Sequence, residues 1–270
     1  MKEKVRLLSL LLLASQIGIA QVTSPPACSI VPEGRPATLT PAKRPSAEQI
    51  TKTAETAAAD PTILVAAEPI SNFGVERYRL ADYAECVGSE GCYWADLDAQ
   101  TKRAEAILDR AIASKKAGEK LAVVLDVDET SLSNYCEIRR EDYGFLLAQM
   151  TQFLATPGAA VAIPGTLRLF NKAREAGLDV FFITGRSDDL LEATGKNLEL
   201  AGFKGWKGLA LRAGPEKQMA TVEYKTQERQ KIVSAGYRIV LNMGDQWSDL
   251  NGEARGEMSV KLPNPFYYLP

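Results

Sequence analysis

The chain has 270 residues, of which 24% are charged, with a net charge of −2 at pH 7 and no histidine. The lack of histidine excludes Ser-His-Asp and Cys-His catalysis, His-ligated zinc and phosphohistidine chemistry. The small acidic excess provides no basic surface for a nucleic-acid polymer, and the abundant oxygen ligands favour Mg²⁺ over zinc as a metal.

Residues 1–20 have the pattern of a secretory signal peptide. Three basic residues precede the apolar run Leu7–Leu13, and Gly18-Ile19-Ala20 forms a small-x-small cleavage site. A membrane anchor is the alternative, which the shortness of the run disfavours. We therefore expect a periplasmic or secreted protein with no stable membrane span in its mature form. Cys28 is a poor lipoprotein site, because it lies far from the apolar run and follows two prolines.

The segment 21–62 is rich in Pro, Ala, Thr and Lys and poor in large apolar residues. This composition predicts a low-complexity, disordered arm, with a short helix near Ala47–Ala59. The remaining residues, 63–270, suit a single domain. The sequence does not indicate an oligomeric state.

The four cysteines of an exported protein are expected to be paired or structural rather than catalytic. Cys86 and Cys92 flank the flexible loop Val-Gly-Ser-Glu-Gly, which a disulfide could close. Cys28 and Cys136 are left without an assigned partner.

A pattern of helix, Ala-Gly and strand recurs four times within residues 94–245. Glycine after a helix supplies the left-handed residue that ends it. Alternating helices and short apolar strands predict an α/β domain, with a doubly wound parallel sheet covered by helices on both faces. The expected strands are Lys120–Asp126, Leu178–Thr184, Phe203–Arg212 and Tyr237–Asp245.

Two aspartates end the first of these strands. Asp126 and Asp128 follow the apolar run Leu121–Leu125, and Val127 between them preserves strand alternation, so both carboxylates start on the same side of the chain. Two negative charges so close together repel each other unless a cation or a shared proton relieves the repulsion. The spacing therefore indicates a metal site, acid/base chemistry, or both.

Polar residues also follow the other strands. They are Thr184, Gly185 and Arg186 after one strand and Asp245 with Asp249 after another, while Lys225 lies in the helix before the last strand. Ligands of such sheets bind at the carboxyl ends of the strands. We therefore expect these side chains to gather at one edge.

Four segments, in this order, resemble the motifs of haloacid-dehalogenase (HAD) superfamily phosphatases: Leu125–Thr130, Phe182–Arg186, Tyr224-Lys225 with Arg229, and Gly244–Asp249. Ser131–Asn134, Asn242–Trp247 and Lys261–Tyr268 are similar to the exported acid phosphatases of subfamily IIIB. These include the bacterial class B/C-like enzymes and the plant acid phosphatases and vegetative storage proteins. The resemblance covers approximately residues 82–268.

The resemblance implies a Rossmann-like HAD core with a small, mainly helical cap, formed by residues of about 63–95 and 135–164. It implies an exported, Mg²⁺-dependent acid phosphatase that acts on small phosphate monoesters, with nucleoside monophosphates among the candidates. The alternative is a non-catalytic storage or binding protein of the same fold. The aromatic residues of 135–164 could stack on a nucleoside or pack in the core.

Residue roles follow from the same resemblance. Asp126 would be the nucleophile that forms an aspartyl-phosphate, and Asp128 the general acid and base. Mg²⁺ would bind the Asp126 carboxylate, the Asp128 backbone carbonyl and Asp245. Asp249 would hold a metal-bound water or orient the lysine.

The remaining motif residues would bind the phosphate. Thr184 would donate a hydrogen bond to a phosphoryl oxygen, helped by backbone amides at the start of a helix after Gly185. Lys225 would neutralise the nucleophile and the charge on phosphorus. Arg186 would reach the phosphate or pair with a carboxylate.

Overall fold

The computed structural model describes residues 24–35, 45–67 and 69–269. The predicted signal peptide, residues 1–20, lies outside the described residues. Among the helices that are described, none combines the length and the apolar character needed to cross a bilayer.

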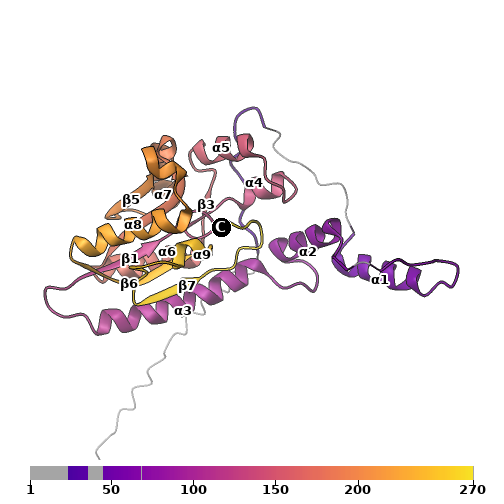
Figure 1. Cartoon of the computed structure of the whole chain (residues 1–270), viewed down its shortest axis with the longest axis horizontal. Coiled ribbons are helices and arrows are strands. Elements are labelled where there is room, and N and C mark those ends of the chain that lie inside the picture. Colours follow the sequence, from indigo (N-terminus) through magenta and orange to yellow (C-terminus); the bar gives the residue numbers. More distant parts are fainter. Residues whose placement is uncertain (1–23, 36–44, 68, 270) are drawn as a thin grey trace, which may run out of the picture.

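Five parallel strands form the central sheet in the order β5-β4-β1-β6-β7 (Figure 1). This confirms the predicted α/β fold with a parallel sheet. The strands are β1 (Lys120–Leu125), β4 (Asp179–Ser187), β5 (Gly208–Arg212), β6 (Tyr237–Gly244) and β7 (Met258–Lys261). The prediction missed the short edge strand β7. It also began β5 too early, because Phe203 is a loop residue that packs in the core against Phe170 and Phe182.

Strand β1 is apolar from Leu121 to Leu125 because helices cover both faces of the sheet. Its alternate residues Leu121, Val123 and Leu125 join the larger core, to which α3 (Tyr93–Ala113) and α6 (Pro164–Glu175) contribute. Ala122 and Val124 face a smaller cluster with residues of α8 (Thr221–Ser234). A strand buried on both sides reads as a continuous apolar run rather than an alternating one.

The Ala-Gly pairs have the predicted geometry after three helices. Gly177, Gly202 and Gly236 have φ values of 71°, 102° and 85°. They follow α6, α7 (Leu191–Leu200) and α8, each of which has an alanine as its last capping residue. Glycine adopts this left-handed conformation without the steric cost that a side chain imposes.

Shorter elements surround the carboxyl ends of the strands. They are α4 (Tyr135–Arg140), α5 (Leu147–Ala155), the antiparallel pair β2 (Leu132–Ser133) and β3 (Val161–Ala162), η1 (Asp188–Leu190), η2 (Gly214–Gln218) and α9 (Trp247–Leu250). Two further helices, α1 (Ala47–Ala58) and α2 (Phe73–Glu85), extend to one side of the sheet (Figure 1). The short helix predicted within the N-terminal arm is thus confirmed as α1. Ser46 caps it with a reciprocal hydrogen-bond pair to Gln49.

Two disulfides link the cysteines. The expected Cys86–Cys92 bond is present, and the unassigned cysteines form a second bond, Cys28–Cys136, across a sequence separation of 108. The long-range disulfide fastens the segment 24–35 to α4. Arg35 adds an ion pair of 2.5 Å to the buried carboxylate of Glu137.

The two disulfides should differ in their contribution to stability. In the chain-entropy account, the Cys28–Cys136 bond stabilises the fold by about 4–5 kcal/mol and the short Cys86–Cys92 loop by about 2 kcal/mol. We expect the paired replacement of Cys28 and Cys136 by alanine to lower the free energy of unfolding about twice as much as the paired replacement of Cys86 and Cys92. Chemical denaturation of both double variants measures this, and equal losses would contradict it.

Candidate active site

The site lies where the strand order of the sheet reverses direction. The chain moves from β1 toward β4 and β5 on one side and from β6 toward β7 on the other. Such a switch point leaves a crevice at the carboxyl ends of the two central strands. Asp126 directly follows β1 and Asp245 directly follows β6, and the Asp126 amide donates to the Met243 carbonyl of β6 at 3.0 Å.

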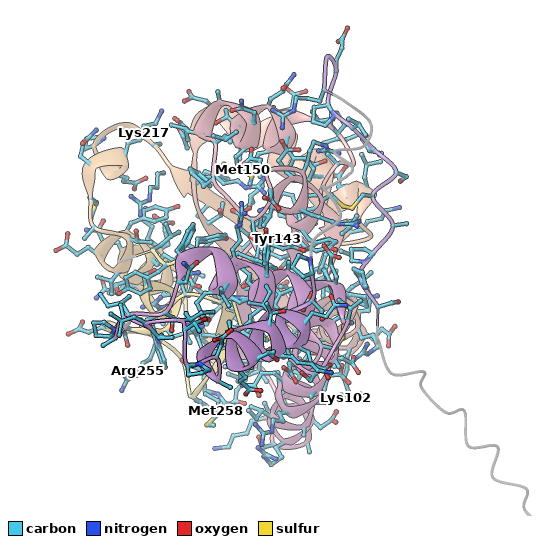
Figure 2. All side chains as sticks on the ribbon, turned by 90° about the vertical axis from the view of Figure 1, so that its right-hand side faces the viewer. Lys102, Tyr143, Met150, Lys217, Arg255 and Met258 are labelled. Atoms are coloured by element: carbon cyan, nitrogen blue, oxygen red, sulfur yellow. A yellow bond between two sulfur atoms is a disulfide. The ribbon has the colours of Figure 1, made fainter. Side chains whose placement is uncertain are left out.

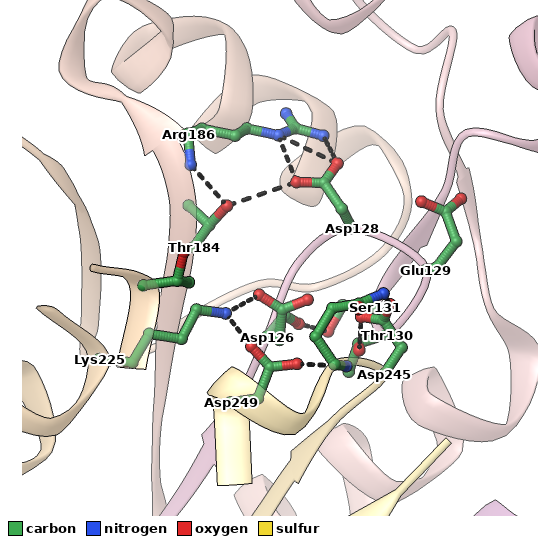
Figure 3. Close-up of polar contacts among 12 residues, drawn as sticks. Asp126, Asp128, Glu129, Thr130, Ser131, Thr184, Arg186, Lys225, Asp245 and Asp249 are labelled. Atoms are coloured by element: carbon green, nitrogen blue, oxygen red, sulfur yellow. Dashed lines mark hydrogen bonds and ion pairs between the residues drawn. The ribbon is translucent and has the colours of Figure 1, made fainter. Parts of the chain in front are cut away.

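Lys225 of α8 joins two of the predicted residues (Figure 3). Its Nζ lies 2.5 Å from Asp126 Oδ1 and also forms an ion pair with Asp249 Oδ1. All three side chains are buried. Gly244 makes this arrangement sterically feasible, because a Cβ there would lie 2.3 Å from the Asp249 side chain. Helix α8, the end of strand β1 and helix α9 thus bring together residues that are far apart in sequence.

The buried carboxylates strain each other electrostatically. Burial raises the pKa of Asp126 well above its ordinary value, and the carboxylates of Asp249 and Asp245 add to this although Lys225 opposes it. Burial and Asp249 also raise the pKa of Asp245. Burial disfavours the charge on Lys225, but Asp126 and Asp249 outweigh that effect and raise the pKa of the ammonium. One lysine therefore does not balance the three carboxylates.

The three carboxylates suit a divalent cation. Among the residues that the structure describes, Asp126, Asp245 and Asp249 each offer an oxygen, and these oxygens lie within 4.8 Å of one another. Hard carboxylate oxygens are the ligands that Mg²⁺ and Ca²⁺ prefer, and a cation among them would relieve the repulsion. The residues present thus fit the metal that the sequence indicated.

Asp128 is held apart from this cluster by Arg186 (Figure 3). Its Oδ1 accepts from Arg186 Nη2 at 2.6 Å and from Asn134 Nδ2 at 2.7 Å, while Oδ2 accepts from Arg186 Nε at 3.0 Å. Burial alone would raise the pKa of Asp128, but Arg186 and Asn134 outweigh it and hold the pKa below its ordinary value. The two aspartates of the first motif therefore have separate cationic partners rather than a shared one.

Thr184 and Gly185 lie in a strand, not before a helix. Strand β4 continues to Ser187, and α7 begins only at Leu191 after the turn η1. The prediction that a helix starts directly after Gly185 is therefore wrong. The Thr184 hydroxyl accepts from the Arg186 amide at 3.2 Å and donates to Asp128 Oδ2 at 3.4 Å. Gly185 is exposed and lines the pocket described below.

Several residues that support Asp245 were not predicted. Asp245 Oδ1 accepts from the Thr130 hydroxyl at 3.0 Å, and Oδ2 accepts at 2.7 Å from both Gln246 Nε2 and Asn264 Nδ2. Asn264 in turn accepts from the Phe266 amide at 2.8 Å, which fixes the C-terminal segment 262–269. No local pattern predicts this role for Asn264, because it lies 19 residues beyond its partner.

Glu129 is buried beside the site. It has a positive φ of 50°, and its carboxylate accepts from the Asn134 amide and from Tyr267 Oη, both at 2.7 Å. Strand alternation, which would turn it away, does not apply because β1 ends at Leu125. Burial, reinforced by Asp128, raises the pKa of Glu129 to about 8.

A cavity of about 640 Å³ opens above these groups. The polar residues Asp126, Asp128, Arg186, Lys225, Asp245 and Asp249 line one part of it. Of the aromatic residues in 135–164, Tyr135 and Tyr143 pack in the core, whereas Phe145 is 60% exposed and lines the cavity. Tyr135 and Tyr143 thus serve core packing, whereas Phe145 is placed where a substrate could contact it.

The sequence matches the family described as HAD superfamily, subfamily IIIB (acid phosphatase), over residues 43–270. The chain belongs to this family.

Curated relatives of this chain include an acid phosphatase and a vegetative storage protein. The chain is 39% identical over 148 residues to acid phosphatase 1 of Solanum lycopersicum, a match that covers 54% of this chain and 58% of the relative. It is 35% identical over 150 residues to vegetative storage protein 1 of Arabidopsis thaliana, covering 54% of this chain and 55% of the relative. The matched part therefore spans little more than half the length of these relatives.

Solved structures of the class C acid phosphatase from Bacillus anthracis have a similar fold. One superposes with a TM-score of 0.53 at 27% identity, covering 65% of this chain and 79% of that chain. The tungstate-bound structure gives a TM-score of 0.55 at 25% identity, covering 71% and 86%.

The support of Asp245 can be tested through metal affinity. Removing the amide of Asn264 in Asn264→Ala takes away one of two donors to Asp245 Oδ2. Loss of such a partner weakens metal binding by about 10- to 100-fold. Calorimetric titration of the metal-free protein with Mg²⁺ measures this. Asn251→Ala removes an exposed amide nearby and should bind Mg²⁺ as the unmodified protein does.

The buried Glu129 carboxyl should make stability depend on pH. Its pKa of about 8 exceeds the value of 4.5 for an unperturbed group, so the folded state binds this proton more tightly than the unfolded state. The free energy of unfolding should therefore fall as pH rises from about 4.5 to about 8 in the metal-free protein. Glu129→Gln, which cannot titrate, should reduce that slope; denaturation at several pH values with an unchanged slope would contradict the assignment.

Proposed function

We propose that the protein is an exported, Mg²⁺-dependent acid phosphatase that hydrolyses small phosphate monoesters through an aspartyl-phosphate. The observation that carries the proposal is the pairing of a buried Asp126–Lys225 contact with a separate Asp128–Arg186 contact at one pocket. A nucleophile and a proton donor need different electrostatic surroundings, and here each aspartate has its own. Nucleoside monophosphates are one candidate class of substrate.

In the first step Asp126 attacks phosphorus. The bond between phosphorus and the ester oxygen breaks as the bond to the carboxylate forms. Lys225, held between Asp126 and Asp249, favours the ionised form of the nucleophile and orients it. Asp128 gives its proton to the departing alkoxide. Since Arg186 favours the ionised form of Asp128, acid conditions, or a phosphate dianion that draws Arg186 away, would assist this transfer.

In the second step water hydrolyses the aspartyl-phosphate. Asp128, now ionised, takes the proton of the attacking water, and inorganic phosphate leaves with Asp126 restored. Arg186 and Asn134 hold the Asp128 carboxylate in place for both steps. Gly185 and Arg186 of β4 line the pocket and directly follow the fully buried Thr184, and these three residues would bind the phosphoryl oxygens.

The metal would be held by Asp126 and Asp245, with the Asp128 backbone carbonyl as a further ligand and Asp249 as a ligand or as the partner of a bound water. When bound, Mg²⁺ would neutralise the carboxylate cluster and polarise a phosphoryl oxygen. The Asp128 side chain is committed to Arg186, which leaves its backbone carbonyl for this role. The tungstate named for the class C structure is an oxyanion of phosphate-like shape, and it supports an anion site in this fold.

A storage protein of the same fold is the second candidate, because relatives include vegetative storage protein 1. Storage alone does not require an aspartate at the nucleophile position, a buried lysine and a carboxylate cluster in one pocket. The presence of all three supports the enzyme.

Export is supported by the two disulfides, since such bonds persist in oxidising compartments. It also agrees with the predicted signal peptide of residues 1–20. We assign the cap to α2, α4 and α5, which lie within the two predicted cap regions.

The decisive experiment compares aspartate variants on two substrates. Asp126→Asn should lower the hydrolysis of p-nitrophenyl phosphate by at least about 10³-fold, and chelation should abolish activity that Mg²⁺ restores. Asp128→Asn should cost about 10²–10⁴-fold for alkyl phosphates, and much less for p-nitrophenyl phosphate, whose leaving group needs no proton. Full activity of Asp126→Asn or of the chelated protein would refute the mechanism.

A further inference from the structure

We propose that the preferred substrate is the phosphate monoester of an apolar, flexible alcohol, and that α5 and the C-terminal segment hold its alkyl chain. The inference rests on the proposed function and specifies the leaving group. It arises from the walls of the catalytic pocket, which differ sharply in chemistry from its charged floor.

Helix α5 turns one apolar face toward the pocket. Leu147, Met150 and Leu154, with Thr151 among them, all line it. Their spacing of three, four and seven residues places them on a single side of the helix. Phe153, on another side, is fully buried in the core and anchors the helix. Met150 is the member of this face labelled in Figure 2.

The opposite wall comes from the end of the chain. Tyr268 and Leu269 line the pocket, and the Leu269 amide donates to Gln246 Oε1 at 3.1 Å. Gln246 also donates to Asp245, so this apolar wall is fixed relative to the catalytic floor. The two walls and the floor belong to one cavity of about 640 Å³.

Large apolar side chains are exposed at the mouth of this pocket. Leu147 and Tyr268 are each 70% exposed and Phe145 is 60% exposed, and all three line the pocket. Contiguous exposed apolar surface beside a site usually serves binding. The side chains of α5 are mainly aliphatic or thioether groups, which adapt to a flexible chain.

Most polar groups beside these walls have partners within the protein, and Arg212 Nε is buried without one. The Thr151 hydroxyl donates to the Leu147 carbonyl at 2.8 Å, and Arg212 donates to the Met219 carbonyl at 2.9 Å and to the Thr221 hydroxyl at 2.7 Å. A nucleoside lying against α5 would leave its own hydroxyl and amide groups unpaired, which is costly. The lining oxygens without a partner, Asn134 Oδ1 and Ser248 Oγ, lie next to Asp128 and Asp249 at the phosphate end.

The position of the walls suits the direction of the leaving group. Asp126 must attack opposite the ester oxygen, and Asp128 must reach that oxygen, so the alcohol extends from the side of Asp128. Asn134, the partner of Asp128, begins the segment that leads through α4 to α5. Because Asp128, Asn134 and the apolar face of α5 line the same cavity, an alcohol on the side of Asp128 can extend along that face.

The test measures affinity against chain length without requiring turnover. Ethyl-, butyl-, hexyl- and octylphosphonate resist hydrolysis and can be titrated calorimetrically into the Mg²⁺-loaded protein. Because each methylene transferred to an apolar site improves binding about two- to fourfold, octylphosphonate should bind at least about 30-fold more tightly than ethylphosphonate. For the matching phosphate esters, kcat/KM should rise in parallel, mainly through KM.

Variants place the effect on α5. The double variant Leu147→Ser with Leu154→Ser should reduce the octyl-to-ethyl ratio by about three- to tenfold. Leu200→Ser, an exposed leucine of α7 outside the pocket, should leave the ratio unchanged. If affinity did not rise with chain length while hydrolysis of p-nitrophenyl phosphate stayed normal, the inference would be overturned and the proposed function would stand. Preference for nucleoside monophosphates over octyl phosphate would also overturn the inference. Binding that strengthens with chain length without any hydrolysis would refute the proposed phosphatase activity but support the apolar binding site.

Discussion

The crowding of buried carboxylates at the switch point of the sheet governs the rest of this structure. Asp126, Asp245 and Asp249 lie within reach of a single cation, and Lys225 compensates only part of their charge. Burial strengthens both the repulsion among the carboxylates and their attraction to a cation, because interactions between charges strengthen as the dielectric constant falls. The fold accordingly supplies donors to almost every oxygen of the cluster, from Thr130 and Gln246 to Asn264 in the C-terminal segment.

The same electrostatic problem separates the two aspartates of the first motif. Chain geometry alone would leave Asp126 and Asp128 as competitors for one cation. Strand β1 ends before both of them, and the chain then turns so that Asp128 meets Arg186 of β4 while Asp126 meets Lys225 of α8. Two neighbouring strands and one helix thereby give two chemically identical side chains opposite pKa shifts. The raised pKa of Asp126 makes a cation beside it a condition for an ionised nucleophile, and the lowered pKa of Asp128 means that acid conditions favour its role as the acid.

The parts of the molecule that could be predicted are those encoded over short distances. Apolar runs, Ala-Gly helix ends and the Asp126-x-Asp128 spacing gave the parallel sheet and the edge at which the site lies. Contacts between distant segments could not be obtained this way. No neighbouring residue predicts the disulfide between Cys28 and Cys136, and none predicts the hydrogen bond between Asn264 and Asp245. The early start assigned to β5 has a related cause, because the apolar character of Phe203 reflects core packing in a loop rather than strand pairing.

The bond between Cys28 and Cys136 also changes the connectivity of the chain. It closes a covalent ring that contains α1, α2, α3 and the whole of β1, together with Asp126 and Asp128. A peptide bond cut anywhere between these cysteines opens the ring but releases no fragment, since both pieces stay joined through sulfur. The exposed α1, which lies to one side of the sheet, can therefore be nicked without separating the N-terminal segment from the domain. Only reduction of the disulfide would then release it as a separate chain.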